Sequence, residues 1–163
     1  MEVCKKQKKN GQISDAIASA KSAVELLPER LDMRKELARL YMRTKRWDLA
    51  EQTLQDVLLI DKVKADTFAM LAELRLIRKQ PKQTESLLRE AIIEGTNSKG
   101  MQLELARALV AQGEDSKARM SEGVIILKRL AETSPEWTRP KAILKRLEAQ
   151  AQSDESNQSE EDR

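Results

Sequence analysis

The stretch WDLAEQTLQDVLLID, residues Trp47–Asp61, decides the fold of this chain. Its apolar residues follow the three- and four-residue spacing of one face of an α-helix. A second stretch, ISDAIASAKSAVELLP (Ile13–Pro28), has a similar rhythm. Neither stretch contains a residue that looks catalytic, so their likeness is the feature to explain.

The likeness is an internal repeat of 34 residues. Aligning the two stretches by their alanines places Ala50 one period after Ala16, and the same step links further positions of similar chemistry. These columns are Val3, Leu37, Leu71 and Leu105; Cys4, Ala38, Ala72 and Ala106; Ala16, Ala50, Thr84 and Ala118; and Gly11, Lys45, Lys79 and Gly113. Because one apolar face of each helical hairpin is too wide to cover itself, neighbouring units must stack into a solenoid.

This pattern resembles the tetratricopeptide repeat, a helix–turn–helix unit of the same period. Leu37, Ala38 and Tyr41 stand at the large, small and aromatic positions of the family's first helix. Pro28 stands at the closing proline of the first repeat, whereas Lys62 replaces that proline in the second. The resemblance implies an all-α, right-handed superhelix of helical hairpins.

The resemblance also sets the expected domain organisation. We expect one repeat domain over residues 1–151, with repeats over about 1–30, 31–64, 65–98 and 99–133, a capping helix over about 135–151, and a disordered acidic tail over 152–163. Lys145 occupies the small-residue column of the last helix, so a further helix could not stack there, and this helix is expected to cap the array. The repeat phase slips beyond Ala118, which predicts a longer second helix in the fourth repeat. Since Val3 already falls mid-helix, either the first helix is short or the chain is a fragment of a longer repeat protein.

Composition excludes several functional classes. The chain has 163 residues, a net charge of +3, no histidine and one cysteine, Cys4. A zinc site, a Cys–His pair and a Ser–His–acid triad cannot be built from this inventory, so we expect no catalytic residue, no metal site and no cofactor. Cys4 is expected to be a small packing residue. The sequence has neither an apolar run long enough to span a membrane nor a secretory signal, which favours the cytoplasm.

The resemblance implies a partner-binding groove, because the first helix of each repeat lines the concave surface in this family. The positions that would face the groove are Lys5, Lys8, Lys9, Lys35, Arg39, Met42, Arg43, Glu73, Ile77 and Arg107. This groove would be basic at one end and more apolar towards the other. It would suit another protein's acidic peptide or helix with some apolar anchors.

Other interpretations stay open on the sequence alone. The basic face can be an ordinary solvated surface, and the chain can be an assembly or regulatory subunit that works through its convex face or its ends. The acidic segment Asp154–Asp162 could occupy its own or a neighbour's basic groove, which would be self-association. Nucleic acid is disfavoured because only four aromatic residues are present, and Trp47 and Trp137 are expected to pack. No small-molecule substrate is expected.

Overall fold

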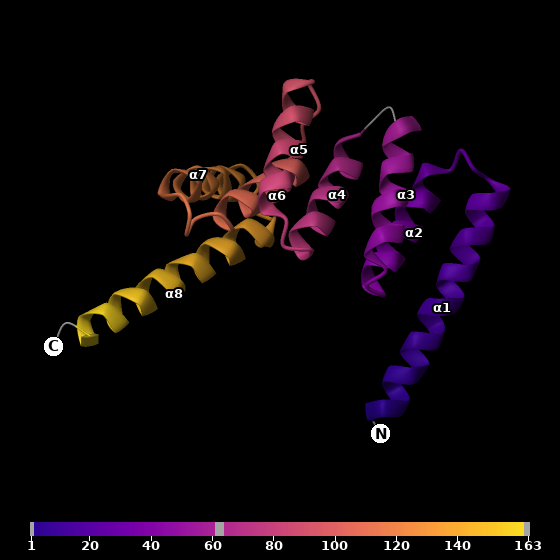
Figure 1. Ribbon diagram of the computed structural model, residues 1–163, viewed down its shortest axis with the longest axis horizontal. Coiled ribbons are helices and arrows are strands. Elements are labelled where there is room, and N and C mark those ends of the chain that lie inside the picture. Colours follow the sequence, from indigo (N-terminus) through magenta and orange to yellow (C-terminus); the bar gives the residue numbers. More distant parts are fainter. Residues whose placement is uncertain (1, 61–63, 162–163) are drawn as a thin grey trace. The chain divides into compact units, whose positions relative to one another are not determined.

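The computed structural model describes the backbone of residues 2–60 and 64–161 and the side chains of residues 11–60 and 64–154. Within these residues the chain forms eight helices and no strand (Figure 1). The helices are α1 (Glu2–Leu26), α2 (Leu31–Arg43), α3 (Trp47–Ile60), α4 (Ala65–Ile77), α5 (Pro81–Ile93), α6 (Lys99–Val110), α7 (Lys117–Thr133) and α8 (Thr138–Glu161). The all-α prediction is therefore confirmed.

Two compact units divide the chain, Met1–Arg78 with α1 to α4 and Lys79–Arg163 with α5 to α8. Within the first unit α1 packs on α2, α2 on α3 and α3 on α4. Within the second unit α5 packs on α6, α6 on α7 and α7 on α8. Among the described residues, no helix combines the length and the apolar character needed to cross a membrane.

Three of the repeat columns identified from the sequence contribute buried residues to the core, among them Leu37, Leu71 and Leu105. The described members of the small-residue column, Ala38, Ala72 and Ala106, are fully buried, with 0% exposure. Ala50 and Thr84 are also fully buried one period apart. The hydroxyl of Thr84 donates to the carbonyl of Gln80 at 2.8 Å, which satisfies this buried polar group.

The turns after α2 and α4 each contain a lysine with a left-handed backbone, whereas the two glycines of the same repeat column, Gly11 and Gly113, have no positive φ. Lys45 has a left-handed backbone, with φ of 59°. Its N–H donates to the carbonyl of Met42, and the N–H of Arg46 donates to the carbonyl of Tyr41, which is the Schellman pattern that ends many helices. Lys79, one period later, has the same φ of 59°. This backbone conformation strains a residue that has a Cβ atom, so glycine would fit these two turns without strain.

Lys45→Gly should therefore stabilise the protein by about 0.5–1 kcal/mol, because relief of the left-handed strain outweighs the entropy that glycine loses on folding. Urea unfolding followed by circular dichroism measures the change. Lys21→Gly is the matched control, since Lys21 is exposed within α1, and it should destabilise by about 1 kcal/mol. A loss of stability in both variants would contradict the role assigned to Lys45.

The start of the chain differs from the sequence-based expectation. The sequence predicts a helical-hairpin repeat over about residues 1–30, but α1 is one unbroken helix from Glu2 to Leu26. Only three apolar residues precede Gly11, which is too few to bury a separate short helix. An unbroken helix satisfies its interior backbone donors and acceptors without that burial.

The fourth repeat is shifted by five residues relative to the 34-residue period. Ala118, expected in a buried column, is exposed. The buried residues of α7 are instead Gly123, Leu127 and Leu130, which have the same spacing as Ala50, Leu54 and Val57 of α3. The segment between α6 and α7 has six residues against three between α4 and α5, and α7 has 17 residues against 13 in α5, as the phase slip predicts.

Gly123 of α7 packs closely against α6. A Cβ atom there would lie 2.9 Å from the carbonyl oxygen of Ala106 and 2.9 Å from Cγ2 of Val110. Gly123→Ala should therefore push the helices apart and destabilise the protein by about 1–3 kcal/mol. Gly11→Ala is the matched control, since nothing lies within 4 Å of its Cβ position, and it should stabilise α1 by about 0.5–1 kcal/mol. Thermal unfolding should show a lower melting temperature for Gly123→Ala and a higher one for Gly11→Ala, each relative to the wild type.

The last helix, α8, covers the core of the second unit. Ile143, Leu144 and Leu147 pack with Trp137 against a buried cluster, so Trp137 is a packing residue as predicted. The cluster consists of Leu103, Ala106, Leu127 and Leu130. The helix continues to Glu161, although the sequence predicts that it ends near residue 151 and that an acidic tail follows.

Candidate functional site

A cavity of about 340 Å³ lies between α2 and α4 in the first unit. The residues that line it are Arg39, Met42 and Arg43 from α2 and Met70, Glu73 and Ile77 from α4. Arg39 and Glu73 are one period apart, as are Arg43 and Ile77. The cavity therefore lies between equivalent faces of two consecutive first helices.

Positive charge and apolar surface meet in this cavity. The guanidinium of Arg39 is half exposed and lies 3.4 Å from the carboxylate of Glu36, and Arg43 is exposed one turn later. Exposed ion pairs contribute little to stability, so Arg39 can exchange Glu36 for another carboxylate at small cost. Met70 is nearly buried and Ile77 is 45% exposed, which gives the cavity apolar walls. Methionine side chains adapt to different apolar shapes because they are unbranched.

The remaining predicted groove residues lie elsewhere. Lys35 lies one turn before Arg39 on α2, is half-buried, and is not part of the cavity lining. Arg107 belongs to the second unit. The side chains of Lys5, Lys8 and Lys9, and that of Cys4, fall outside the described residues. Met70 is the lining residue that the prediction missed, although it lies one turn before Glu73.

Arg107 lines a second cavity, of about 280 Å³, between α6 and α8. The other lining residues are Arg139, Ala142, Ile143 and Arg146, all from α8. Glu104 is buried, with a side chain 4% exposed, and its carboxylate pairs with Arg107 at 2.5 Å and lies 3.8 Å from Arg139. Three guanidinium groups therefore surround this cavity beside one buried carboxylate.

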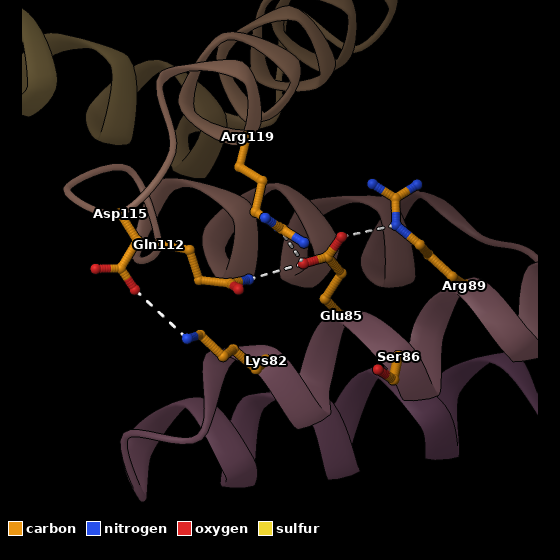
Figure 2. A pocket seen from close by; sticks show the side chains of 7 residues that line it. All are labelled: Lys82, Glu85, Ser86, Arg89, Gln112, Asp115 and Arg119. Atoms are coloured by element: carbon orange, nitrogen blue, oxygen red, sulfur yellow. Dashed lines mark hydrogen bonds and ion pairs between the residues drawn. The ribbon is translucent and has the colours of Figure 1, made fainter.

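A third cavity of the second unit is built around the buried carboxylate of Glu85 on α5 (Figure 2). Its Oε1 accepts a hydrogen bond from Nε of Arg89 at 2.9 Å. Its Oε2 accepts one from Nε2 of Gln112 at 2.9 Å and one from Nε of Arg119 at 3.0 Å. Arg89 also pairs with Glu122 at 2.7 Å. These bonds tie α5 to α7 and to the turn that follows α6.

The protein environment favours the ionised form of Glu85. Burial raises the pKa of this carboxyl. The hydrogen bonds from Gln112, Arg89 and Arg119 together lower the pKa by more than burial raises it, so the pKa lies below the ordinary 4.5. Every hydrogen-bonding partner is a side chain of the same unit. The arrangement is therefore a structural tie and not an acid–base pair poised for catalysis.

The same tie occurs one period earlier in the first unit. Glu51 of α3 accepts a hydrogen bond from Arg78 at 2.7 Å and one from Arg75 at 3.3 Å. Glu51 and Glu85 are 34 residues apart, as are their donors Arg78 and Gln112. The sequence analysis missed this polar column, although the two glutamates in phase were the signal that could have revealed it.

Glu85→Gln should destabilise the protein by about 1–3 kcal/mol at pH 7, because a buried carboxylate with charged donors is replaced by a neutral amide. Since the folded pKa of Glu85 is lowered, its contribution is fully present above the unfolded pKa and is lost as the pH falls through the folded pKa. The stability difference between wild type and variant should therefore shrink below about pH 4.5. Urea unfolding at pH 7 and pH 3 measures it, with exposed Glu90→Gln on the same helix as control. A difference independent of pH would contradict this role.

Stacked helix pairs with a 34-residue period define a helical-repeat protein. Residues 8–74 match the tetratricopeptide repeat family. The resemblance stated from the sequence is therefore confirmed over these residues. A comparison with curated proteins finds no match.

Solved structures support the same fold. The chain resembles the crystal structure of MamA, with a TM-score of 0.60 and 17% identity over 86% of this chain and 79% of that one. It resembles the TPR-like repeats of a putative kinesin light chain from Podosopora anserina, with a TM-score of 0.58 and 23% identity over 85% and 74% of the two chains. It also resembles YrrB, described as a TPR protein with an unusual peptide-binding site, with a TM-score of 0.55 and 17% identity over 82% and 66%. These likenesses confirm the solenoid fold class.

Proposed function

We propose that this chain is a non-catalytic interaction module that binds a peptide or helix of another protein in the α2–α4 cavity. The observation that carries the proposal is that five of the ten predicted groove residues line one cavity. These are Arg39, Met42, Arg43, Glu73 and Ile77. Solenoid proteins commonly bind partners on surfaces built from equivalent positions of successive repeats.

The lining of the cavity favours an acidic ligand with an apolar anchor. Two guanidinium groups face one carboxylate, that of Glu73, so the cavity carries excess positive charge. Arginine pairs well with carboxylates, while Met42, Met70 and Ile77 offer apolar contact. The peptide-binding site in the description of YrrB supports the same kind of use for this fold. The proposed compartment is the reducing cytoplasm, in keeping with the single cysteine.

A peptide library displayed on phage and selected against the full chain tests the ligand class. We expect selected peptides to combine two or more acidic residues with a Met, Leu or Ile. Fluorescence polarisation of one such peptide should then show at least about tenfold weaker binding to Arg39→Glu/Arg43→Glu, because like charges then face each other.

The control for this experiment is Lys21→Glu/Lys64→Glu, which makes the same charge change at two exposed sites of the first unit outside the cavity. This variant should retain the affinity of the wild type within about twofold, since exposed charges at a distance are screened by salt. Selected peptides without acidic residues, or equal losses in both variants, would overturn the proposed site.

A further inference from the structure

The α6–α8 cavity of the second unit is the counterpart of the α2–α4 cavity of the first. Helix α4 begins 34 residues after α2, and α8 begins 39 residues after α6, which is the same period plus the five-residue shift. Glu73 follows Arg39 by 34 residues, and Arg146 follows Arg107 by 39. Arg107 itself lies two periods after Arg39. The second cavity therefore has an arginine at the position where the first has a glutamate.

The arginines of the α6–α8 cavity come from two packed helices. Arg139 and Arg146 are seven residues apart on α8, so they lie on the same face of that helix. Ile143 lies between them on this face, and Arg107 reaches the same cavity from α6. The cavity is therefore lined by three guanidinium groups and by the apolar side chains of Ala142 and Ile143.

One buried carboxylate holds two of these guanidinium groups in place. Glu104 has a side chain that is 4% exposed, and its Oε2 lies 2.5 Å from Nη1 of Arg107. Its Oε1 lies 3.8 Å from Nη2 of Arg139. Because Arg107 and Arg139 are already positioned, an anion that binds them would lose less affinity to the ordering of side chains.

The charge of the cavity is not balanced by its own residues. Arg146 is exposed and pairs with no carboxylate in the described part of the chain. Glu104 offsets one of the three guanidinium charges, so about two positive charges remain at this cavity. A single carboxylate ligand would neutralise only one of them.

We propose that the α6–α8 cavity binds a phosphorylated side chain of a partner protein. A phosphate monoester carries about −1.5 to −2 charges at pH 7 and has three acceptor oxygens, which matches the charge and the donors of this cavity. All three cationic lining residues are arginines, whose planar guanidinium groups can each donate two parallel hydrogen bonds to phosphate. Ala142 and Ile143 offer apolar contact to the rest of the phosphorylated residue.

The lining favours a phosphorylated peptide over nucleic acid. None of the lining residues is aromatic, so a base would have no ring to stack on. The three arginines surround one cavity of about 280 Å³, which accommodates one phosphorylated residue. All of these residues belong to the second unit, so the proposal does not depend on the peptide site between α2 and α4.

Peptide libraries with a fixed central phosphoserine, phosphothreonine or phosphotyrosine, screened against the full chain, provide the probe. The best peptide is then made with the phosphorylated residue, with glutamate and with the unmodified residue, and titrated by calorimetry. We expect the phosphorylated form to bind at least about tenfold more tightly than the glutamate form and about a hundredfold more tightly than the unmodified form. Failure to select any phosphopeptide, or equal affinity for the phosphorylated and glutamate forms, would overturn the proposal.

Arg146→Glu locates the bound phosphate. This variant should bind the phosphopeptide at least about thirtyfold more weakly, since the carboxylate repels it, while circular dichroism should show unchanged helicity because residue 146 is exposed. Arg146→Lys should lose about threefold to tenfold, since lysine keeps the charge but not the two parallel hydrogen bonds. Lys128→Glu, at an exposed site of α7, is the matched control and should bind within about twofold of the wild type.

Two further measurements separate this site from its alternatives. Arg39→Glu/Arg43→Glu should keep its affinity for the phosphopeptide within about twofold, because these residues line the cavity of the other unit. Loss of binding in that variant with full binding by Arg146→Glu would place the phosphate in the wrong cavity. A single-stranded DNA of about 12 nucleotides that binds as tightly as the phosphopeptide and depends on Arg146 would also contradict the proposal.

Discussion

Close approach of helix backbones at the small-residue columns is the constraint on which the rest of this structure depends. Ala38, Ala72 and Ala106 are fully buried, and larger side chains there would separate packed helices. Gly123 makes a similar close approach, since a Cβ atom there would lie 2.9 Å from the carbonyl oxygen of Ala106. The buried residues of α7 are shifted by five positions, yet they keep the spacing of the buried residues of α3. The segment before α7 can therefore differ in length without changing these contacts. The contacts therefore set the fold, and the turns adjust to them.

Much of the architecture could be predicted because it is periodic. Once the buried columns are known, helix geometry fixes which positions lie on the neighbouring face. This reasoning places Arg39, Met42 and Arg43 beside Glu73 and Ile77 before any coordinates are seen, and those five side chains do line one cavity. The same reasoning selected Arg107, which the structure places instead beside α8.

The features that could not be predicted depend on competition between alternatives. At Gly11 the choice between a turn and a continuous helix depends on how much apolar surface a short helix could bury, and column alignment does not measure that. The polar tie at Glu85 requires the rotamers of Gln112 and Arg119 to converge on one carboxylate. The helical end of α8 is not predicted because its polar composition suggests disorder, although nine of the fourteen residues from 148 to 161 are Ala, Gln or Glu, which favour helix.

The ties at Glu51 and Glu85 have a consequence for how repeats influence one another. Each joins the second helix of one repeat to residues of the following repeat, α3 to α4 in the first unit and α5 to the α6–α7 pair in the second. In a linear array, stability is a sum of intrinsic repeat energies and nearest-neighbour couplings. Loss of one repeat would remove the partners of a charge in its neighbour. The two glutamates thereby increase the cooperativity of unfolding along the array.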